Sequence, residues 1–185
     1  MIPTGENKIS IIVPCYNEKE TIKIIIDKIY NTEIEKFEVI VVDDNSTDGS
    51  KEIIEKLKNN LSNLQTIYHD QNFGKGEAIK NGIIKSTGNI ILIQDADLEY
   101  DPDDYEKLLE PFLKYNADVV YGSRFVGGNG PKRLHFFWHT IANKILTLLT
   151  NIFTNLNMSD METGYKVFKK KYINANKLEQ RSFGI

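Results

Sequence analysis

The sequence predicts an α/β fold with a mostly parallel sheet and helices on both of its faces. Short apolar, β-branched runs alternate with amphipathic segments along the chain, which is the pattern of parallel strands joined by helical crossovers. The length of 185 residues suits one such domain and is too short for two ordinary ones. Because the sequence has neither an internal repeat nor a low-complexity linker, we expect a single domain over residues 1–185.

Six strands are expected from short apolar runs. They cover residues 8–14, 37–42, 64–68, 89–93, 117–121 and 165–168. In an open α/β sheet the ligand crevice lies beyond the carboxyl ends of the strands. The loops that follow the first, second and fourth strands should therefore converge at one edge of the sheet.

Five amphipathic helices are expected between these strands. The first begins at Asn17, which forms a capping box with Glu20, and the others cover residues 51–61, 76–85, 103–115 and about 135–156. Asp48 is assigned to the start of the second helix. Pro111 should kink or divide the fourth. The glycine-rich stretch 127–131 is expected to be the most flexible loop.

Composition and charge exclude several classes of protein. A formal net charge of −3 argues against a nucleic-acid binder, which usually carries a basic face. The single cysteine, Cys15, excludes an internal disulfide and a cysteine-built zinc site. The N-terminus lacks a signal-peptide layout, and no run of eighteen apolar residues occurs. We expect a cytoplasmic protein whose chain continues beyond Ile185. A membrane segment in that continuation is compatible with the sequence.

Two carboxylates, Asp95 and Asp97, follow the fourth strand on either side of Ala96. At this spacing they repel each other unless a cation lies between them. Mg²⁺ or Mn²⁺ binds through one or two carboxylates together with substrate phosphate oxygens. The motif predicts a metal that bridges a donor diphosphate, with Glu99 as a third oxygen ligand. The alternative is a solvated acidic turn before Pro102.

Two other loops point to a nucleotide. Asp43 and Asp44 end the second strand, where an acidic residue hydrogen-bonds a ribose or base in nucleotide-binding α/β folds. We assign Asp44 to the nucleotide, alongside the helix capping that also explains acidic residues here. Residues 72–76 (NFGKG) precede a helix, so that their amides and Lys75 can approach an anion; a plain glycine turn is the alternative. The spacing is not that of a P-loop ATPase or kinase.

The chain resembles family 2 glycosyltransferases from about Ile9 to Phe168. Six motifs stand in the order found in that family: PCYNE (14–18), VVDDNSTDGS (41–50), NFGKGEA (72–78), DADLEYDP (95–102), YGSRF (121–125) and DMETGYKVF (160–168). The branch that it most resembles is that of the dolichol-phosphate mannosyltransferases and other polyprenyl-phosphate glycosyltransferases. The resemblance implies a GT-A fold and inversion at the anomeric carbon, with a UDP- or GDP-sugar as the donor.

The resemblance also implies roles for individual residues. The positions that match the family's nucleotide site are Pro14, Tyr16, Glu18 and Asp44. We assign to the same nucleotide-sugar site four neighbours from these motifs, namely Asn17, Lys75, Asp95 and Ala96. The implied metal ligands are Asp95, Asp97 and Glu99, although the branch often has glutamine in place of Glu99. Arg124 matches a residue that meets the acceptor phosphate, a task suited to a bidentate guanidinium, and Lys132 or Arg133 is expected to add a second positive contact.

The nature of the acceptor decides how much catalysis the protein must supply. Transfer to a sugar hydroxyl needs a general base, for which Asp160 and Glu162 are the candidates. A phosphate acceptor is already ionised, so these carboxylates would then orient the donor sugar or the metal shell; Asp160 equally suits a turn cap. We expect Asp97, Arg124, Asp160 and Glu162 to carry catalysis.

Polyprenyl phosphate is the favoured acceptor, and a saccharide or other hydroxyl acceptor of cell-envelope synthesis is the alternative. A nucleotidyltransferase is disfavoured because PCYNE stands where that class has a glycine-rich, arginine-containing loop. A non-catalytic module that binds nucleotide sugars is disfavoured by the intact set of Asp95, Asp97 and Arg124. The sequence does not fix the oligomeric state.

The helix expected at 135–156 allows two interpretations. One of its faces is an apolar stripe, made of Trp138, Ile141, Ile145, Leu149, Ile152 and Leu156. In the favoured interpretation this stripe packs on the core. In the other, the helix makes peripheral contact with the cytoplasmic face of a membrane, with Phe136, Phe137 and Trp138 at headgroup level. Few lysines and arginines stand on its polar face, which counts against strong attraction to anionic lipid.

Overall fold

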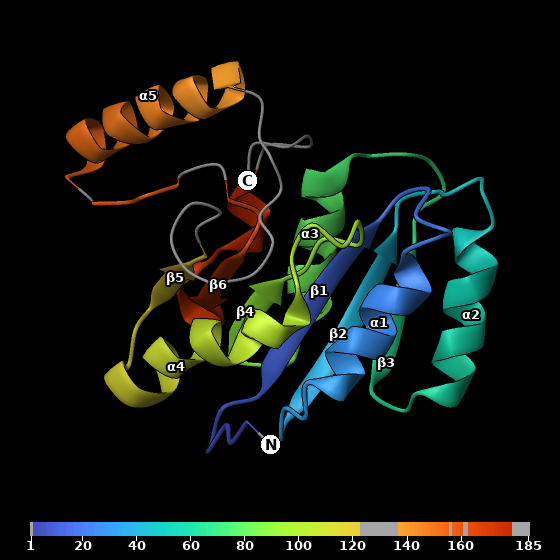
Figure 1. Cartoon of the computed structure of the whole chain (residues 1–185). Helices are drawn as coiled ribbons and strands as arrows, with labels where there is room; N and C mark the ends of the chain where they lie inside the picture. Colours follow the sequence, from blue (N-terminus) through green and yellow to red (C-terminus); the bar gives the residue numbers. More distant parts are fainter. Residues whose placement is uncertain (1, 123–136, 156, 161–162, 179–185) are drawn as a thin grey trace.

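The computed structural model describes residues 2–122, 137–155, 157–160 and 163–178, and its strands form one six-stranded sheet (Figure 1). The strand order is β3-β2-β1-β4-β6-β5. The bounds are Ile9–Cys15 (β1), Phe37–Asp43 (β2), Leu64–Tyr68 (β3), Ile90–Ile93 (β4), Val119–Tyr121 (β5) and Lys166–Lys169 (β6). The first four strands are parallel, and β6 runs antiparallel to both β4 and β5. The predicted α/β class is confirmed.

Helices cover both faces of this sheet, as the continuous buried runs of β1, β2 and β4 require. The helices are α1 (Ile22–Asn31), α2 (Ser50–Asn60), α3 (Lys75–Lys85), α4 (Tyr105–Tyr115) and α5 (Phe137–Thr154), with 3₁₀ turns at Pro102–Asp104, Lys170–Tyr172 and Ala175–Lys177. Ile11 and Val13 of β1 pack in the core that α1, α2 and α4 share. Ile12 points to the opposite face and packs with Ile79 and Ile83 of α3.

The predicted start of the first helix is wrong. Helix α1 begins at Ile22, and Asn17 does not cap it. Asn17 has a left-handed backbone with φ of 57°, and its Oδ1 accepts a hydrogen bond from Thr47 N at 2.8 Å. A contact with the next loop therefore takes the place of the capping box. Of the two effects predicted for Pro111, the division of the helix does not occur, since α4 continues through this residue to Tyr115; the kink stays a prediction.

Helix α5 buries two polar side chains and exposes most of its large apolar ones. Asn143 and Thr147 are only 3% and 7% exposed, whereas Ile152 and Phe153 are 65% and 84% exposed. The buried polar groups bond to one another and to Asp160. The prediction that the apolar stripe packs on the core is therefore wrong. The buried carboxylate of Asp160, in the segment that follows α5, needs hydrogen-bond donors, which an apolar stripe cannot supply.

A buried carboxylate, Glu38, joins the amino-terminal ends of the parallel strands. Its two oxygens accept from Ser10 Oγ of β1 at 2.6 Å and from Gln65 Nε2 of β3 at 3.1 Å. Thr87, before β4, donates its N–H at 2.6 Å and its hydroxyl at 2.8 Å. Lys8 Nζ adds an ion pair at 2.9 Å. These bonds hold four strands in register at the edge opposite their carboxyl ends.

These hydrogen bonds lower the pKa of Glu38. Burial alone would raise it, but the hydrogen bonds from Ser10, Thr87 and Lys8 outweigh burial and lower it from 4.5 to about 2. A carboxyl whose pKa is lowered by folding stabilises the fold above its unfolded pKa. That stabilisation is lost as the pH falls through the folded pKa.

We predict that the free energy of unfolding falls by about 3 kcal/mol between pH 4.5 and pH 2 through Glu38 alone. Urea unfolding across this range should show a shallower pH dependence in Glu38→Gln than in the wild type. Glu52→Gln, which changes an exposed residue of α2, is the control and should keep the wild-type slope. Equal slopes in the wild type and Glu38→Gln would contradict the prediction.

Candidate active site

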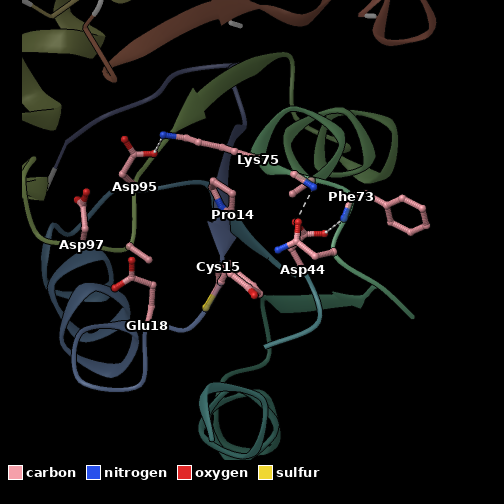
Figure 2. A pocket seen from close by; sticks show the side chains of 13 residues that line it. Pro14, Cys15, Glu18, Asp44, Phe73, Lys75, Asp95 and Asp97 are labelled. Carbon is pink, nitrogen blue, oxygen red and sulfur yellow. Dashed lines mark hydrogen bonds and ion pairs between the residues drawn. The ribbon is translucent and has the colours of Figure 1, made fainter. Parts of the chain in front are cut away.

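A pocket of about 600 Å³ opens at the carboxyl ends of β1, β2 and β4. It is lined by Pro14, Cys15, Tyr16, Glu18, Asp44, Asn72, Phe73, Gly74, Lys75, Ala78, Asp95, Ala96 and Asp97. Figure 2 shows Asp44 and Phe73 on one side, Asp95 and Asp97 on the other, and Pro14 and Cys15 between them. The ends of these three strands converge in the structure, as predicted.

Asp44 shapes one side of this pocket. Its carboxylate accepts from the N–H groups of Phe73 at 2.9 Å and Gly74 at 2.8 Å, which fixes the loop before α3 (Figure 2). A third bond, of 2.6 Å, joins Asp44 Oδ1 to His69 Nδ1. Asn81 Nδ2 lies 3.0 Å from the other ring nitrogen, so a donating amide there leaves the ring proton on Nδ1, facing Asp44. A carboxylate has about four acceptor positions, so one remains for a ligand.

Lys75 and Asp95 form the other side. Lys75 is the first residue of α3, and its Nζ lies 2.5 Å from Asp95 Oδ1 (Figure 2). This ion pair places an ammonium group beside the carboxylate pair of Asp95 and Asp97, and so reduces the repulsion between them. The start of a helix also carries a partial positive charge. This side of the pocket therefore combines anionic oxygen ligands with positive groups.

Gln94 holds the loop that carries Asp95 and Asp97. This fully buried side chain donates from Nε2 to the carbonyl oxygens of Asp95 at 2.9 Å and Tyr100 at 3.1 Å. Its Oε1 accepts from the hydroxyls of Tyr105 at 2.8 Å and Tyr165 at 3.1 Å. One amide thus ties both ends of the 95–100 loop to α4 and to the residue before β6.

Gly164 lets the segment before β6 approach the same loop. A Cβ atom at this position would lie 2.8 Å from Asp95 Oδ2 and 2.6 Å from the ring of Tyr100. The Gly164 N–H donates to the Tyr100 hydroxyl at 2.7 Å. Only glycine fits such an approach of backbone to side chain.

Lys166, the first residue of β6, lies among these charges. Burial, and next the charge of Lys75, lower its pKa, while the carboxylates of Asp95 and Asp160 act in the opposite direction. Lys166 is thus within electrostatic reach of the Lys75–Asp95 pair and of Asp160 as well.

Cys15 lines the pocket but is unsuited to nucleophilic chemistry. Burial, followed by the charges of Asp43 and Glu18, raises the pKa of its thiol to about 12. The reactive form of cysteine is the thiolate, so this side chain stays protonated at neutral pH.

The structure gathers most of the predicted donor residues at the pocket. Three predicted residues lie elsewhere: Asn17 bonds to Thr47, Glu99 is exposed and outside the lining, and Asp160 bonds to Asn143. Within the described residues, no three histidine, cysteine or acidic side chains form a group that could hold a metal ion. Arg124, Lys132, Arg133, Glu162 and the glycine-rich stretch 127–131 lie outside the described residues.

Sequence reasoning missed Gln94, Asn143, Gly164 and Lys166. A signal existed for Gln94, because it is the one polar residue that continues the apolar run of β4. Asn143 stood on the face of its helix that looked solvent-exposed. The positions of Gly164 and Lys166 depend on the antiparallel pairing of β6, which joins distant parts of the chain.

The family model for glycosyl transferase family 2 matches residues 10–176. The chain belongs to glycosyltransferase family 2. The resemblance seen in the six motifs is thereby confirmed, and with it the assignment of this domain to the glycosyltransferases.

Curated relatives of this family 2 domain include two enzymes named for polyprenyl phosphates. Dolichol-phosphate mannosyltransferase of Pyrococcus furiosus is 26% identical over 180 residues, which are 96% of this chain and 51% of the relative. Undecaprenyl-phosphate 4-deoxy-4-formamido-L-arabinose transferase of Proteus mirabilis is 26% identical over 173 residues, which are 91% of this chain and 51% of the relative. The chain spans about half the length of these curated relatives.

Solved structures confirm the GT-A fold of the family 2 domain. Mannosyltransferase PcManGT from Pyrobaculum calidifontis, solved in complex with GDP-Man and Mn²⁺, has a TM-score of 0.70 at 22% identity. The match covers 96% of this chain and 49% of that protein.

We predict that Gln94→Glu lowers the free energy of unfolding by about 2–3 kcal/mol, measured by urea denaturation. A carboxylate of the same shape cannot donate, so it would face the carbonyl oxygens of Asp95 and Tyr100 without hydrogen bonds. Tyr105→Phe is the comparison and should cost about 1 kcal/mol, because Tyr165 still donates to Gln94. A Gln94→Glu variant as stable as Tyr105→Phe would show that the loop does not depend on the amide.

Proposed function

We propose that this domain transfers a sugar from a nucleotide-sugar donor to a polyprenyl phosphate, with inversion at the anomeric carbon. One observation carries the proposal: a single pocket joins the Asp44 side to the Asp95–Asp97 side (Figure 2). At one side, Asp44 can accept a hydrogen bond from a ribose hydroxyl or a base. At the other, Lys75 and the Asp95–Asp97 pair are suited to a diphosphate and its metal ion. A nucleoside diphosphate that spans the pocket would meet both.

The donor's nucleoside would lie against Asp44 and Tyr16. Asp44 has one acceptor position left for a hydroxyl or a base edge, and half-exposed Tyr16 offers a ring face for stacking. The diphosphate would lie at the start of α3, where the helix end and Lys75 are both positive. UDP- and GDP-sugars both meet these requirements.

Asp95 and Asp97 would hold Mg²⁺ or Mn²⁺ at the diphosphate. Both carboxylates line the pocket, and an all-oxygen set completed by phosphate suits these hard ions. When bound, the ion offsets negative charge on the departing nucleoside diphosphate. Lys75, which pairs with Asp95, would contact a phosphate oxygen beside it. Glu99 stays a predicted ligand that the described pocket does not include.

The acceptor side is proposed to need no general base. Asp160 is 2% exposed and lies outside the pocket lining, which supports a positioning role for it. An ionised phosphate acceptor can attack without losing a proton to a base, and both curated relatives are named for such acceptors. Arg124, with Lys132 or Arg133, remains the predicted contact for the acceptor phosphate.

We further propose that α5 lies on the membrane that carries the lipid acceptor. Its outward face exposes large apolar side chains: Trp138, Ile145, Leu146, Leu148, Leu149, Ile152 and Phe153. Figure 1 shows the helix lying clear of the sheet. No helix among the described residues is long and apolar enough to cross a bilayer. An amphipathic helix of this kind is suited to the interface, with its apolar face among the acyl chains.

We predict that Asp97→Asn weakens Mn²⁺-dependent donor binding at least tenfold, because the change removes a charge that opposes the cation. Thermal shift with UDP-, GDP- and dTDP-sugars, with and without Mn²⁺, would identify the donor and measure the loss. Asp103→Asn is the control, since it removes the same charge from an exposed site outside the pocket. Donor binding by Asp97→Asn that matches the wild type under both conditions would refute the metal assignment.

We predict that Ile152→Glu reduces binding to phosphatidylglycerol vesicles at least tenfold in a co-sedimentation assay. Burying an isoleucine side chain contributes about 1.5–3 kcal/mol, and a charge in its place opposes insertion. Ile84→Glu is the matched control, because Ile84 is 55% exposed on α3. Equal vesicle binding by the two variants would contradict the membrane proposal. Sedimentation velocity showing a dimer that Ile152→Glu abolishes would instead assign the face to a second copy of the chain.

A further inference from the structure

His69 contacts the nucleotide side of the pocket from outside its lining, and it lies outside the six family motifs. It is the first residue after β3, and its N–H donates to the carbonyl oxygen of Asp43 at 2.9 Å, at the end of β2. Its ring nitrogen Nδ1 lies 2.6 Å from Asp44 Oδ1, and the side chains of His69 and Asp44 are only 6% and 4% exposed. The imidazole is thus bonded directly to a residue that lines the pocket.

The hydrogen bonds of this ring run in one direction, from α3 to Asp44. A carboxylate can only accept, so the proton between the two side chains is on His69 Nδ1. Asn81 Nδ2, on α3, lies 3.0 Å from the other ring nitrogen, which accepts from it. The ring of Phe73 packs edge-on against the imidazole, with 5.2 Å between the ring centroids. The orientation of the ring and the place of its proton are therefore both fixed.

The bond from His69 decides which oxygen of Asp44 is left for a ligand. Each carboxylate oxygen has two acceptor positions. Among the described residues, His69 Nδ1 and the Phe73 N–H occupy both positions on Oδ1, and the Gly74 N–H occupies one on Oδ2. The remaining position is on Oδ2. A ligand with an N–H or O–H group therefore meets one acceptor, which points in one direction.

The other half of the pocket does not depend on this bond. Without the imidazole proton, Asp44 would offer an acceptor on either oxygen, and its carboxylate would be free to turn. The loop before α3 would still be held by the N–H groups of Phe73 and Gly74. Lys75 would keep its place at the start of the helix. The effect of His69 is thus confined to the nucleoside side.

We propose that His69, held by Asn81, is a positioning residue that aims a single acceptor of Asp44 at the nucleoside of the donor. The inference rests on the proposed function and deepens it, because it concerns how that site holds the nucleoside part of its substrate. It separates the contribution of His69 to nucleoside binding from the binding of the diphosphate.

Calorimetric titration with UDP, GDP and inorganic pyrophosphate, each with Mg²⁺, tests the inference. For His69→Phe we expect the Kd of the nucleoside diphosphate that the wild type binds more tightly to rise at least tenfold, because a hydrogen bond to a charged group is lost. The Kd of pyrophosphate should change less than twofold. Equal losses for both ligands, or none for the nucleoside diphosphate, would overturn the inference. So would a wild type that binds UDP and GDP no more tightly than pyrophosphate.

His69→Asn is the conservative variant. Its amide nitrogen can stand in the place of Nδ1 and donate to Asp44, although the ring is gone. We expect its Kd for the same nucleoside diphosphate to stay within threefold of the wild type, even where the Tm falls as much as in His69→Phe. If the ring served stability alone, His69→Asn would bind the nucleotide as weakly as His69→Phe, and that result would contradict the inference.

Asn81→Leu provides a second variant that keeps the imidazole and removes only the donor to Nε2. It should weaken binding of the nucleoside diphosphate at least threefold and leave pyrophosphate binding unchanged. Asn60→Leu is the matched control, because Asn60 is exposed on α2 and its Nδ2 donates to the carbonyl oxygen of Lys56 at 3.0 Å. Equal nucleotide affinity in the two leucine variants would show that Asn81 does not hold the ring for binding.

Transfer kinetics distinguish a failure of the inference from a failure of the proposed function. With the donor identified by the screen, His69→Phe should raise the KM for the donor at least tenfold while kcat changes less than threefold. A fall in kcat at unchanged KM would overturn the inference. A wild type that binds UDP or GDP but transfers no sugar to a polyprenyl phosphate would refute the proposed function, and the contrast between His69→Phe and His69→Asn would still decide the inference.

Discussion

Glu38 lies at the end of the sheet opposite the pocket, and its carboxylate accepts hydrogen bonds from groups on β1 and β3 and from the residues before β4. A parallel sheet has no tight turns to set the register of its strands, since each connection is a long crossover. The buried charge of Glu38, in β2, bonds to β1, to β3 and to the residue Thr87 before β4, and so contributes to that alignment. The positions of the loops at the carboxyl ends follow from it, and the pocket depends on those loops.

Carboxylates in the pocket serve the architecture as well as the chemistry. Asp44 holds the Phe73–Gly74 backbone in place before it meets any ligand, and Asp95 is paired with Lys75. The side chain of Gln94 holds the loop that carries Asp95 by hydrogen bonds to the carbonyl oxygens of Asp95 and Tyr100. The site is therefore organised in advance, and a bound donor would spend little free energy on ordering it.

The two faces of helix α5 differ in their surroundings: two polar side chains point inward, and large apolar side chains are exposed. Asn143 donates a hydrogen bond to Asp160, whereas the exposed apolar residues have no protein surface packed over them in the described part of the chain. The arrangement inverts the usual amphipathic helix of a globular domain, in which apolar residues face the core.

The local pattern of the sequence was enough to determine the strands, most helices and the motifs at their ends. Apolar periodicity and turn residues are local signals, and parallel strands bring their carboxyl ends together whatever their exact register. Only the tertiary structure decided which partner each polar group meets. Asn17 bonds to Thr47 rather than capping a helix, Gln94 reaches Tyr165 across 71 positions, and α5 turns Asn143 inward. Periodicity reveals that a helix has two faces, but the partner that covers each face comes from distant parts of the chain or from outside it.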